Sequence, residues 1–221
     1  MALPTPPDDG GPRYHGVYPA LVTDIVDPQN LGRVEVKFPW LTAAGEQDVR
    51  AWARLCSSYA DNDQGFQVMP EVGSEVLVAF GAGLFDWPYI VGSVWNGKEK
   101  TPTKPERANN IRVIRSRADS RLEFDDTAGA SKVSITMASG HQVVLDNAAQ
   151  TVTIRHGMGC VITLDPVAVS INANVQLHVT APMVNVDAAV ATFSGIVKAN
   201  TVIADAFVLS PAYSPGVGNL L

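Results

Sequence analysis

Charged side chains are scarce in this sequence and almost vanish from its C-terminal part. They make up 17% of the 221 residues, and from Val167 onward only Asp187, Lys198 and Asp205 carry a charge. A soluble domain usually has about a quarter of its residues charged. With 46% apolar residues the chain is nevertheless far from the composition of a disordered protein. It is long enough for one ordinary domain or two small ones.

Long apolar runs and targeting signals are missing as well. No run approaches the roughly 18 residues that a membrane-spanning helix needs, because polar residues interrupt the pattern at every second position. The first residues have neither the basic region nor the apolar region of a secretory signal. We therefore expect a protein that is cytoplasmic during assembly. The net charge of −6 makes nucleic acid an unfavourable partner.

Groups that carry chemistry are few. Cys56 and Cys160 fall in different halves of the chain, and we predict that both are buried free thiols. The adjacent carboxylates Asp125 and Asp126 point to opposite sides of an extended chain, so they are better explained as turn acids than as an acid/base pair. We predict no enzyme, no catalytic residue, no metal and no cofactor. The four histidines are scattered along the chain: His15, His141, His156 and His178.

What the second half does contain is a short repeated word of two apolar residues that flank a polar one. Strict alternation places the first and third residues on one face of a strand. One strand per rung cannot wrap round a core of its own, and no amphipathic helix is present to cover the face, so another copy of the chain is the natural cover. The words are Val133-Ser134-Ile135, Val143-Val144-Leu145, Val152-Thr153-Ile154, Ile162-Thr163-Leu164, Val169-Ser170-Ile171, Leu177-His178-Val179 and Val184-Asn185-Val186.

This alternation predicts an inward face that forms the core of a trimer. In the word at 177–179 it leaves His178 facing solvent, where a lone histidine is more often solvated than bound to a metal. The predicted trimer-core residues are Val143, Leu145, Val152, Ile154, Ile162, Leu164, Val169, Ile171, Leu177, Val179, Val184 and Val186.

The first half predicts longer strands separated by true turns, without a convincing helix. Strands are expected at 14–25, 33–38, 52–56, 75–80 and 89–95, with a turn at Asp27-Pro28-Gln29-Asn30 and another at Gly81-Ala82-Gly83. Five or six antiparallel strands in about eighty residues are typical of a small barrel of the OB type. The interval Lys98 to Asn110 is charged, contains proline and lacks an apolar pattern, so we interpret it as a linker.

Two stretches of this half resemble a known family. They are Gly16 to Trp40, which contains Asp27-Pro28 and Gly32-Arg33-Val34, and Pro70 to Gly97, which contains Val72-Gly73-Ser74-Glu75-Val76 and Pro88-Tyr89-Ile90-Val91-Gly92-Ser93-Val94-Trp95. They look like the OB-fold domain of central spike proteins of contractile tails, which include baseplate assembly protein V of phages, VgrG of type VI secretion and the spikes of phage-tail-like extracellular injection particles. The order of the elements, a barrel and then a repetitive β-stalk, fits the same family.

The resemblance implies an all-β homotrimer in which an OB-fold barrel is followed by an intertwined trimeric β-helix, or β-prism. Such a spike would belong to the baseplate of a contractile tail or phage-tail-like particle, contact a hub protein at the barrel end and pierce the target envelope on sheath contraction. Because VgrG proteins carry the hub ahead of the barrel and little precedes Tyr14 here, we expect a separate hub polypeptide. The expected organisation is a flexible segment 1–13, the barrel 14–97, the linker 98–110, the spike 111–209 and a tip segment 210–221.

The end of the sequence departs from the repeat. Residues 210–221 contain two prolines and two glycines and finish on apolar residues, which is no strand pattern. Since spikes of this family commonly receive a conical PAAR-repeat protein, we expect this segment to dock such a tip protein. The expected docking residues are Tyr213, Pro215, Val217, Leu220 and Leu221.

Two other functions remain as alternatives. A trimeric β-helical depolymerase of cell-surface glycan would need groove carboxylates supported by aromatic rings, and the stalk contains only Phe124, Phe193, Phe207 and Tyr213. An OB-fold binder of nucleic acid would need a basic groove with stacking aromatic rings. The acidic balance of the chain argues against the second alternative.

Overall fold

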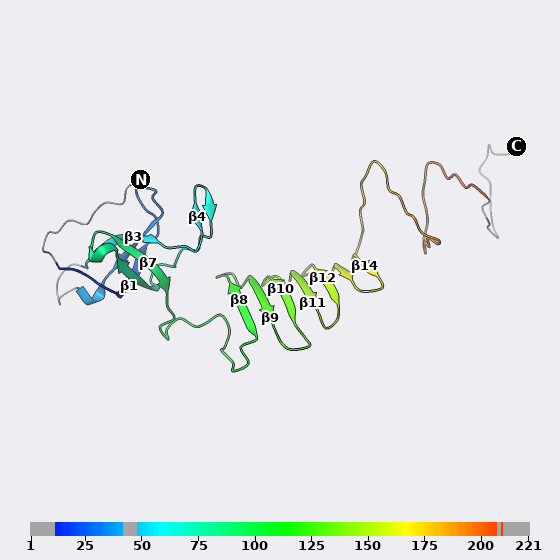
Figure 1. The fold of residues 1–221 in the computed structure, drawn as a ribbon. Helices are drawn as coiled ribbons and strands as arrows, with labels where there is room; N and C mark the ends of the chain where they lie inside the picture. The colour runs from blue at the N-terminus through cyan, green and yellow to red at the C-terminus, as the bar shows by residue number, and fades with distance from the viewer. Residues whose placement is uncertain (1–11, 42–47, 207–208, 210–221) are drawn as a thin grey trace. The chain divides into compact units, whose positions relative to one another are not determined.

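The computed structural model describes residues 12–41, 48–206 and 209 of the chain. It is built from β-strands, with two short 3-10 turns at Pro39–Leu41 and Gly81–Gly83. Figure 1 shows a barrel formed by the first part of the sequence and a single sheet formed by the next part. By its packing the chain divides into two units, one up to Asn174 and one from Val175. No helix among the described residues is long and apolar enough to cross a membrane.

Five strands close the barrel in the order β1-β2-β3-β7-β6, which confirms the predicted OB-like barrel. Four of the five pairings are antiparallel, whereas β3 and β7 pair in parallel at Arg54–Tyr89 and Leu55–Ile90. A small hairpin of β4 and β5 interrupts the chain between β3 and β6 where the sequence predicts a loop. The bounds are β1 Val17–Asp24, β2 Arg33–Lys37, β3 Arg50–Leu55, β4 Ala60–Asp61, β5 Gln64–Gly65, β6 Glu75–Phe80 and β7 Pro88–Ser93.

Alternation along the strands creates the core of the barrel. In β2, Val34 and Val36 are fully buried while their neighbours face outward, and β6 repeats this pattern with Val76 and Val78. The β-branched side chains are stiff and pack well on the pleated inner surface. The complete set of buried apolar residues is Ala20, Val22, Val34, Val36, Phe38, Ala53, Val76, Val78, Phe80 and Ile90.

The turn between β1 and β2 is built around a buried carboxylate. Asp27 is only 6% exposed and accepts hydrogen bonds from the backbone N–H groups of Gln29, Leu31 and Arg33. The Arg33 guanidinium adds two more, from Nε at 2.8 Å and from Nη2 at 2.9 Å. The Arg33 side chain, helped by the backbone N–H groups, holds the pKa of Asp27 far below its usual range. The predicted turn at 27–30 is confirmed by the bond from Asn30 N to the Asp27 carbonyl, 3.0 Å long.

The stalk is a seven-stranded antiparallel sheet in which each strand pairs with the next along the chain. The strands lie side by side as a ladder in Figure 1. Short turns of a few residues join them, so every strand reverses direction and the apolar words fall into register. The bounds are β8 Ile111–Arg115, β9 Arg121–Asp125, β10 Lys132–Thr136, β11 Gln142–Asp146, β12 Thr151–Arg155, β13 Val161–Leu164 and β14 Val169–Asn172.

The last two repeated words do not form strands in the single chain. Between Ala173 and Ala206 no strand is assigned, although the words at 177–179 and 184–186 alternate as those in the sheet do. A strand needs a partner for its backbone N–H and C=O groups, and this part of the chain has none within reach in one copy. Its side chains are exposed, with Val175 and Ile196 each 98% accessible.

The prediction of buried thiols is wrong for the single chain. Cys56 and Cys160 are both free, and both are exposed. Cys56 follows the end of β3, and Cys160 lies in the turn between β12 and β13, so both stand where strands run out to the surface. A small hydrophobic side chain is buried only where its backbone lies in a packed element.

We predict that Asp27→Asn lowers the melting temperature of the barrel by several degrees, because an amide cannot serve five donors as the carboxylate does. A carboxyl whose folded-state pKa is depressed stabilises the fold above its unfolded pKa, about 3.9, and loses that contribution as the pH falls further. The stability of Asp27→Asn should therefore fall less steeply below about pH 4. Thermal unfolding measured at neutral pH and below about pH 4 tests both the lower melting temperature and the shallower dependence on pH. The control is Asp24→Asn, whose exposed carboxylate accepts one bond from Val26 N. Equal melting curves for the two variants would contradict the prediction.

Candidate interaction face of the stalk

Strand register places the apolar residues of the stalk in two parallel columns on one face of the sheet. Val133 lies opposite Leu145, and Leu145 lies opposite Val152, so equivalent residues stack from strand to strand. The first column continues from Phe124 through Val133, Leu145, Val152 and Leu164 to Val169, and the second consists of Ile114, Leu122, Ile135, Val143, Ile154, Ile162 and Ile171. We call these thirteen residues the two-column face.

This face is not covered in the single chain. Ile135, Leu145, Ile154 and Ile171 are 52%, 47%, 46% and 53% exposed, whereas the barrel core is essentially inaccessible. An apolar ladder of this length on a soluble protein normally has a partner. Eight of the predicted trimer-core residues lie in the two columns. The remaining four, Leu177, Val179, Val184 and Val186, lie in the segment without strands and are exposed.

The opposite face of the same sheet has a different character. Its central row runs through Glu123, Ser134, Val144, Thr153, Thr163 and Ser170. Short hydroxyl side chains dominate this row, and they hydrate well on a strand surface. The sheet is therefore two-sided, with one face suited to water and one face suited to protein.

Aspartates stand at the ends of alternate strands and organise the turns at one end of the strands of the sheet. Asp125 accepts bonds from Thr127 N and Oγ1, Asp146 from Ala149 N, and Asp165 from Val167 N and Ala168 N. These are Asx turns, in which the carboxylate replaces a backbone carbonyl. The Thr127 hydroxyl and its backbone N–H lower the pKa of Asp125, which favours the ionised carboxylate in this turn. The neighbouring Asp126 pairs instead with Arg112 Nη1.

Two histidines that lie apart in the sequence meet in the turns at the opposite end of the strands. The rings of His141 and His156 have centroids 4.4 Å apart. Their Nδ1 atoms accept hydrogen bonds from Gly157 N and Met158 N, respectively, each 3.2 Å long. In the sequence these two histidines look scattered. They meet only because the turn between β10 and β11 stacks on the turn between β12 and β13. His178 bonds only with Thr180 Oγ1, and the described part of the chain contains no cluster of three metal-ligating side chains.

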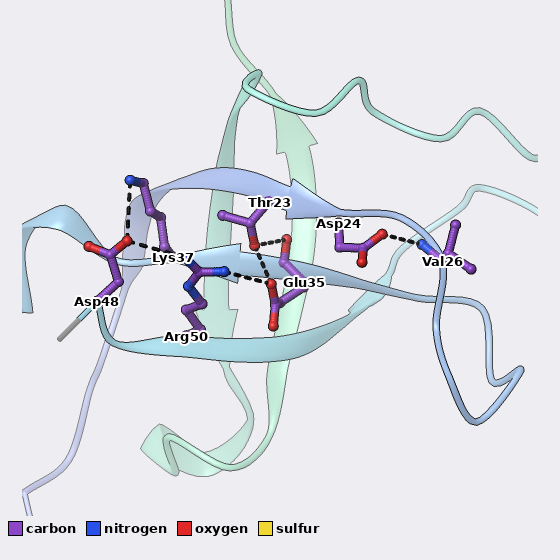
Figure 2. A network of polar contacts seen from close by, with 7 residues as sticks. All are labelled: Thr23, Asp24, Val26, Glu35, Lys37, Asp48 and Arg50. Carbon is purple, nitrogen blue, oxygen red and sulfur yellow. Dashed lines mark hydrogen bonds and ion pairs between the residues drawn. The ribbon is translucent and has the colours of Figure 1, made fainter.

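The barrel carries a charged outer face on β2 and β3, and three of its cations form ion pairs. Figure 2 shows Arg50 bonded to Glu35 at 3.2 Å and to Asp48 at 3.4 Å, while Lys37 reaches Asp48 at 3.5 Å. Glu35 is held by Thr23 Oγ1 at 2.6 Å. Arg33 is engaged with Asp27. Lys37, Arg50 and Arg33 therefore have carboxylate partners, whereas Arg54 of β3 contacts the ring and hydroxyl of Tyr89.

The geometry defines a class of protein: an OB-like barrel followed by a β-stalk whose apolar face is exposed in the single chain. Comparison with known families agrees with this class. Residues 18–95 match the type VI secretion system/phage-baseplate injector OB domain, and residues 111–190 match the phage baseplate V C-terminal trimerisation domain. The chain belongs to this family of injector spike proteins.

Curated relatives include three spike-related proteins. The type VI secretion system spike protein VgrG3 of Vibrio cholerae is 26% identical over 149 residues, which is 62% of this chain and 15% of the relative. The actin cross-linking toxin VgrG1 of Vibrio cholerae is 29% identical over 132 residues, 57% of this chain and 12% of the relative. The spike protein VgrG4b of Pseudomonas aeruginosa is 29% identical over 135 residues, 56% of this chain and 17% of the relative. The chain thus spans less than a fifth of the length of these relatives.

We predict that Gly157→Ala destabilises the stalk, because a Cβ at this position would overlap the Ser139 carbonyl oxygen of the stacked turn. Relief requires the backbones of the two turns to separate, which also strains the His141–His156 contact. Overpacking of this kind typically costs about 1–3 kcal/mol. Denaturant unfolding of the full chain checks this, with Gly195→Ala as the control because open space surrounds Gly195. A loss no larger than in the control would contradict the close approach of the turns.

Proposed function

We propose that this protein is the structural, trimeric spike at the centre of the baseplate of a contractile injection system. The observation that carries the proposal is the uncovered two-column face, because it lies in the segment that matches a trimerisation domain. Three copies would turn these faces toward a common axis and leave the hydroxyl-rich faces to solvent. The result is a prism with an apolar core.

In this proposal the twelve trimer-core residues line the axis. Each strand from β9 to β14 contributes two apolar side chains per chain and β8 contributes Ile114, and full burial of each stabilises by roughly 1.5–3 kcal/mol before conformational entropy is counted. The words at 177–179 and 184–186 would become strands only when neighbouring chains supply their hydrogen-bond partners. This accounts for a segment that has the sequence pattern of the sheet but no strands in one copy.

The mechanism of such a spike is mechanical. Sheath contraction would drive the prism against the target envelope, and the prism must not unfold under the load. Because the three chains share one core, many rungs must break together before any chain can leave. Resistance therefore depends on a slow unfolding rate rather than on a large equilibrium stability.

An enzyme is a weaker alternative. A depolymerase needs two carboxylates placed around a substrate groove, but Asp125, Asp146 and Asp165 are committed to turns and Asp126 to Arg112. A nucleic-acid binder conflicts with the paired cations of β2 and β3. We therefore assign a non-enzymatic role and a place within the injection apparatus.

We expect Ile171→Asp to prevent formation of the trimer. The substitution would place three carboxylates near one axis without cations to pair them, and burial of an unpaired charge costs several kcal/mol. The matched control is Ser170→Asp, because the adjacent residue lies on the opposite face of β14. Light scattering after size-exclusion chromatography gives the mass of each variant. A heat-resistant Ile171→Asp trimer would overturn the assignment of the inward face, whereas a monomeric wild type would overturn the proposed function.

The proposal also includes two partners, a hub at the barrel end and a PAAR-type protein at the tip. The predicted docking residues Tyr213, Pro215, Val217, Leu220 and Leu221 lie outside the described residues. They stay a prediction that rests on the turn-rich, apolar sequence of this segment.

Deletion of residues 210–221 tests the tip. We expect the shortened chain to remain trimeric, since its apolar words are intact, but to lose co-purification with a coexpressed PAAR protein at least tenfold. The full-length chain is the control. An intact trimer with unchanged tip binding would contradict the docking role, and loss of the trimer would assign the segment to the trimer itself.

A further inference from the structure

A row of residues from four consecutive strands continues the ladder of the stalk past the strand ends. Met137 N donates a hydrogen bond to the His141 carbonyl at 3.0 Å, and His156 N donates one to the Cys160 carbonyl at 2.8 Å. Between these two hairpin turns the rings of His141 and His156 lie with their centroids 4.4 Å apart. The histidine pair is therefore the centre of a row that crosses β10 to β13.

Alternation places this pair on the same side of the sheet as the two-column face. His141 lies two residues before Val143, and His156 lies two residues after Ile154, and both of these neighbours belong to the second column. The two rings also line one hollow together with Ile135, Val143 and Ile154. A partner that covers the two-column face would therefore cover the histidine pair as well.

The turns hold the two imidazoles in a way that suits the neutral ring. Gly157 N donates to His141 Nδ1 and Met158 N donates to His156 Nδ1, each at 3.2 Å. A ring nitrogen accepts a hydrogen bond only while it carries no proton. Protonation of one ring would set an N–H group against a backbone N–H group. Protonation of both would add two like charges on neighbouring rings.

The groups around the pair offer a positive charge no compensation. The charged side chain that lines the same hollow is that of Arg155, which is itself a cation. The ladder neighbours are the thioether of Met137 on β10 and the thiol of Cys160 on β13. The acid of the adjacent turn, Asp119, already has two cationic partners at 2.7 and 2.9 Å, which are Arg115 and Arg121. Acid therefore adds positive charge here without adding a partner for it.

From this arrangement we infer that the His141–His156 pair makes the stalk sensitive to acid, so that protonation of the pair loosens the trimer below about pH 6. The inference rests on the proposed trimeric spike. In one copy water can solvate a charged ring, whereas a covered face excludes that water. The unfolded chains would then bind more protons than the trimer, and the stability of the trimer falls as the pH falls.

The first experiment measures the unfolding rate of the full-length trimer in denaturant at about pH 7.5 and at about pH 5. We expect the wild-type rate to rise at least tenfold between the two. In the double variant His141→Asn with His156→Asn the rise should be less than threefold, because an amide oxygen still accepts a backbone bond but gains no proton. The matched control is His178→Asn, which removes a histidine outside the pair and should behave as the wild type.

Hydrogen exchange of the wild-type trimer follows the two turn bonds directly. After correction for the intrinsic effect of pH on exchange, the N–H groups of Gly157 and Met158 should lose protection at least tenfold between the same two pH values. The N–H of Asn147, which donates to the Ser131 carbonyl, should not. This measurement uses the unchanged chain, so it decides the inference even where the double variant does not assemble.

A trimer whose unfolding rate does not change with pH, or a double variant with the wild-type rise, would overturn this inference and leave the proposed function standing. A loss of protection at Gly157 and Met158 no greater than at Asn147 would also overturn it. A chain that is monomeric at about pH 7.5 would overturn the proposed function as well.

Discussion

A single chain of this protein cannot cover its own apolar surface, and the rest of the structure depends on that constraint. The stalk has one strand per rung and short turns, so its two columns of valine, leucine and isoleucine have nothing to pack against within one copy. Hydrophobic burial is the main favourable term in folding. A sheet that exposes apolar side chains along one whole face leaves that favourable term unused in a single copy.

The barrel, in contrast, buries its apolar side chains within one chain. Closure of five strands encloses Val34, Val36, Val76, Val78 and Phe38, so that the N-terminal part has a core of its own. A single buried carboxylate also organises a turn of the barrel: Asp27 accepts hydrogen bonds from three backbone N–H groups and from the Arg33 guanidinium. The barrel therefore has a closed core within one chain, whereas the apolar face of the stalk is exposed in one chain.

The ionisable groups differ in their structural roles between the two parts. In the stalk, Asp125, Asp146 and Asp165 accept hydrogen bonds within the turns that follow strands. On the barrel, Lys37 and Arg50 form ion pairs with Asp48 and Glu35. The two-column face of the stalk, in contrast, is apolar and exposed in one copy.

The sequence by itself determined most of the strands and which residues of a strand share a face, because period-two alternation is a local property: Val34 and Val36 share one face of β2, and Val152 and Ile154 share one face of β12. The Asp-Pro turn at position 27 and the glycine-rich turn at 81–83 are local as well. Tertiary structure alone decided what depends on distant residues meeting. The parallel pairing of β3 with β7 follows from barrel closure, and the contact of His141 with His156 follows from the stacking of two turns. The exposure of Cys56 and Cys160 follows from where strands end on the surface. The words at 177–179 and 184–186 show the limit of local pattern, because a strand exists only when another strand supplies its hydrogen bonds.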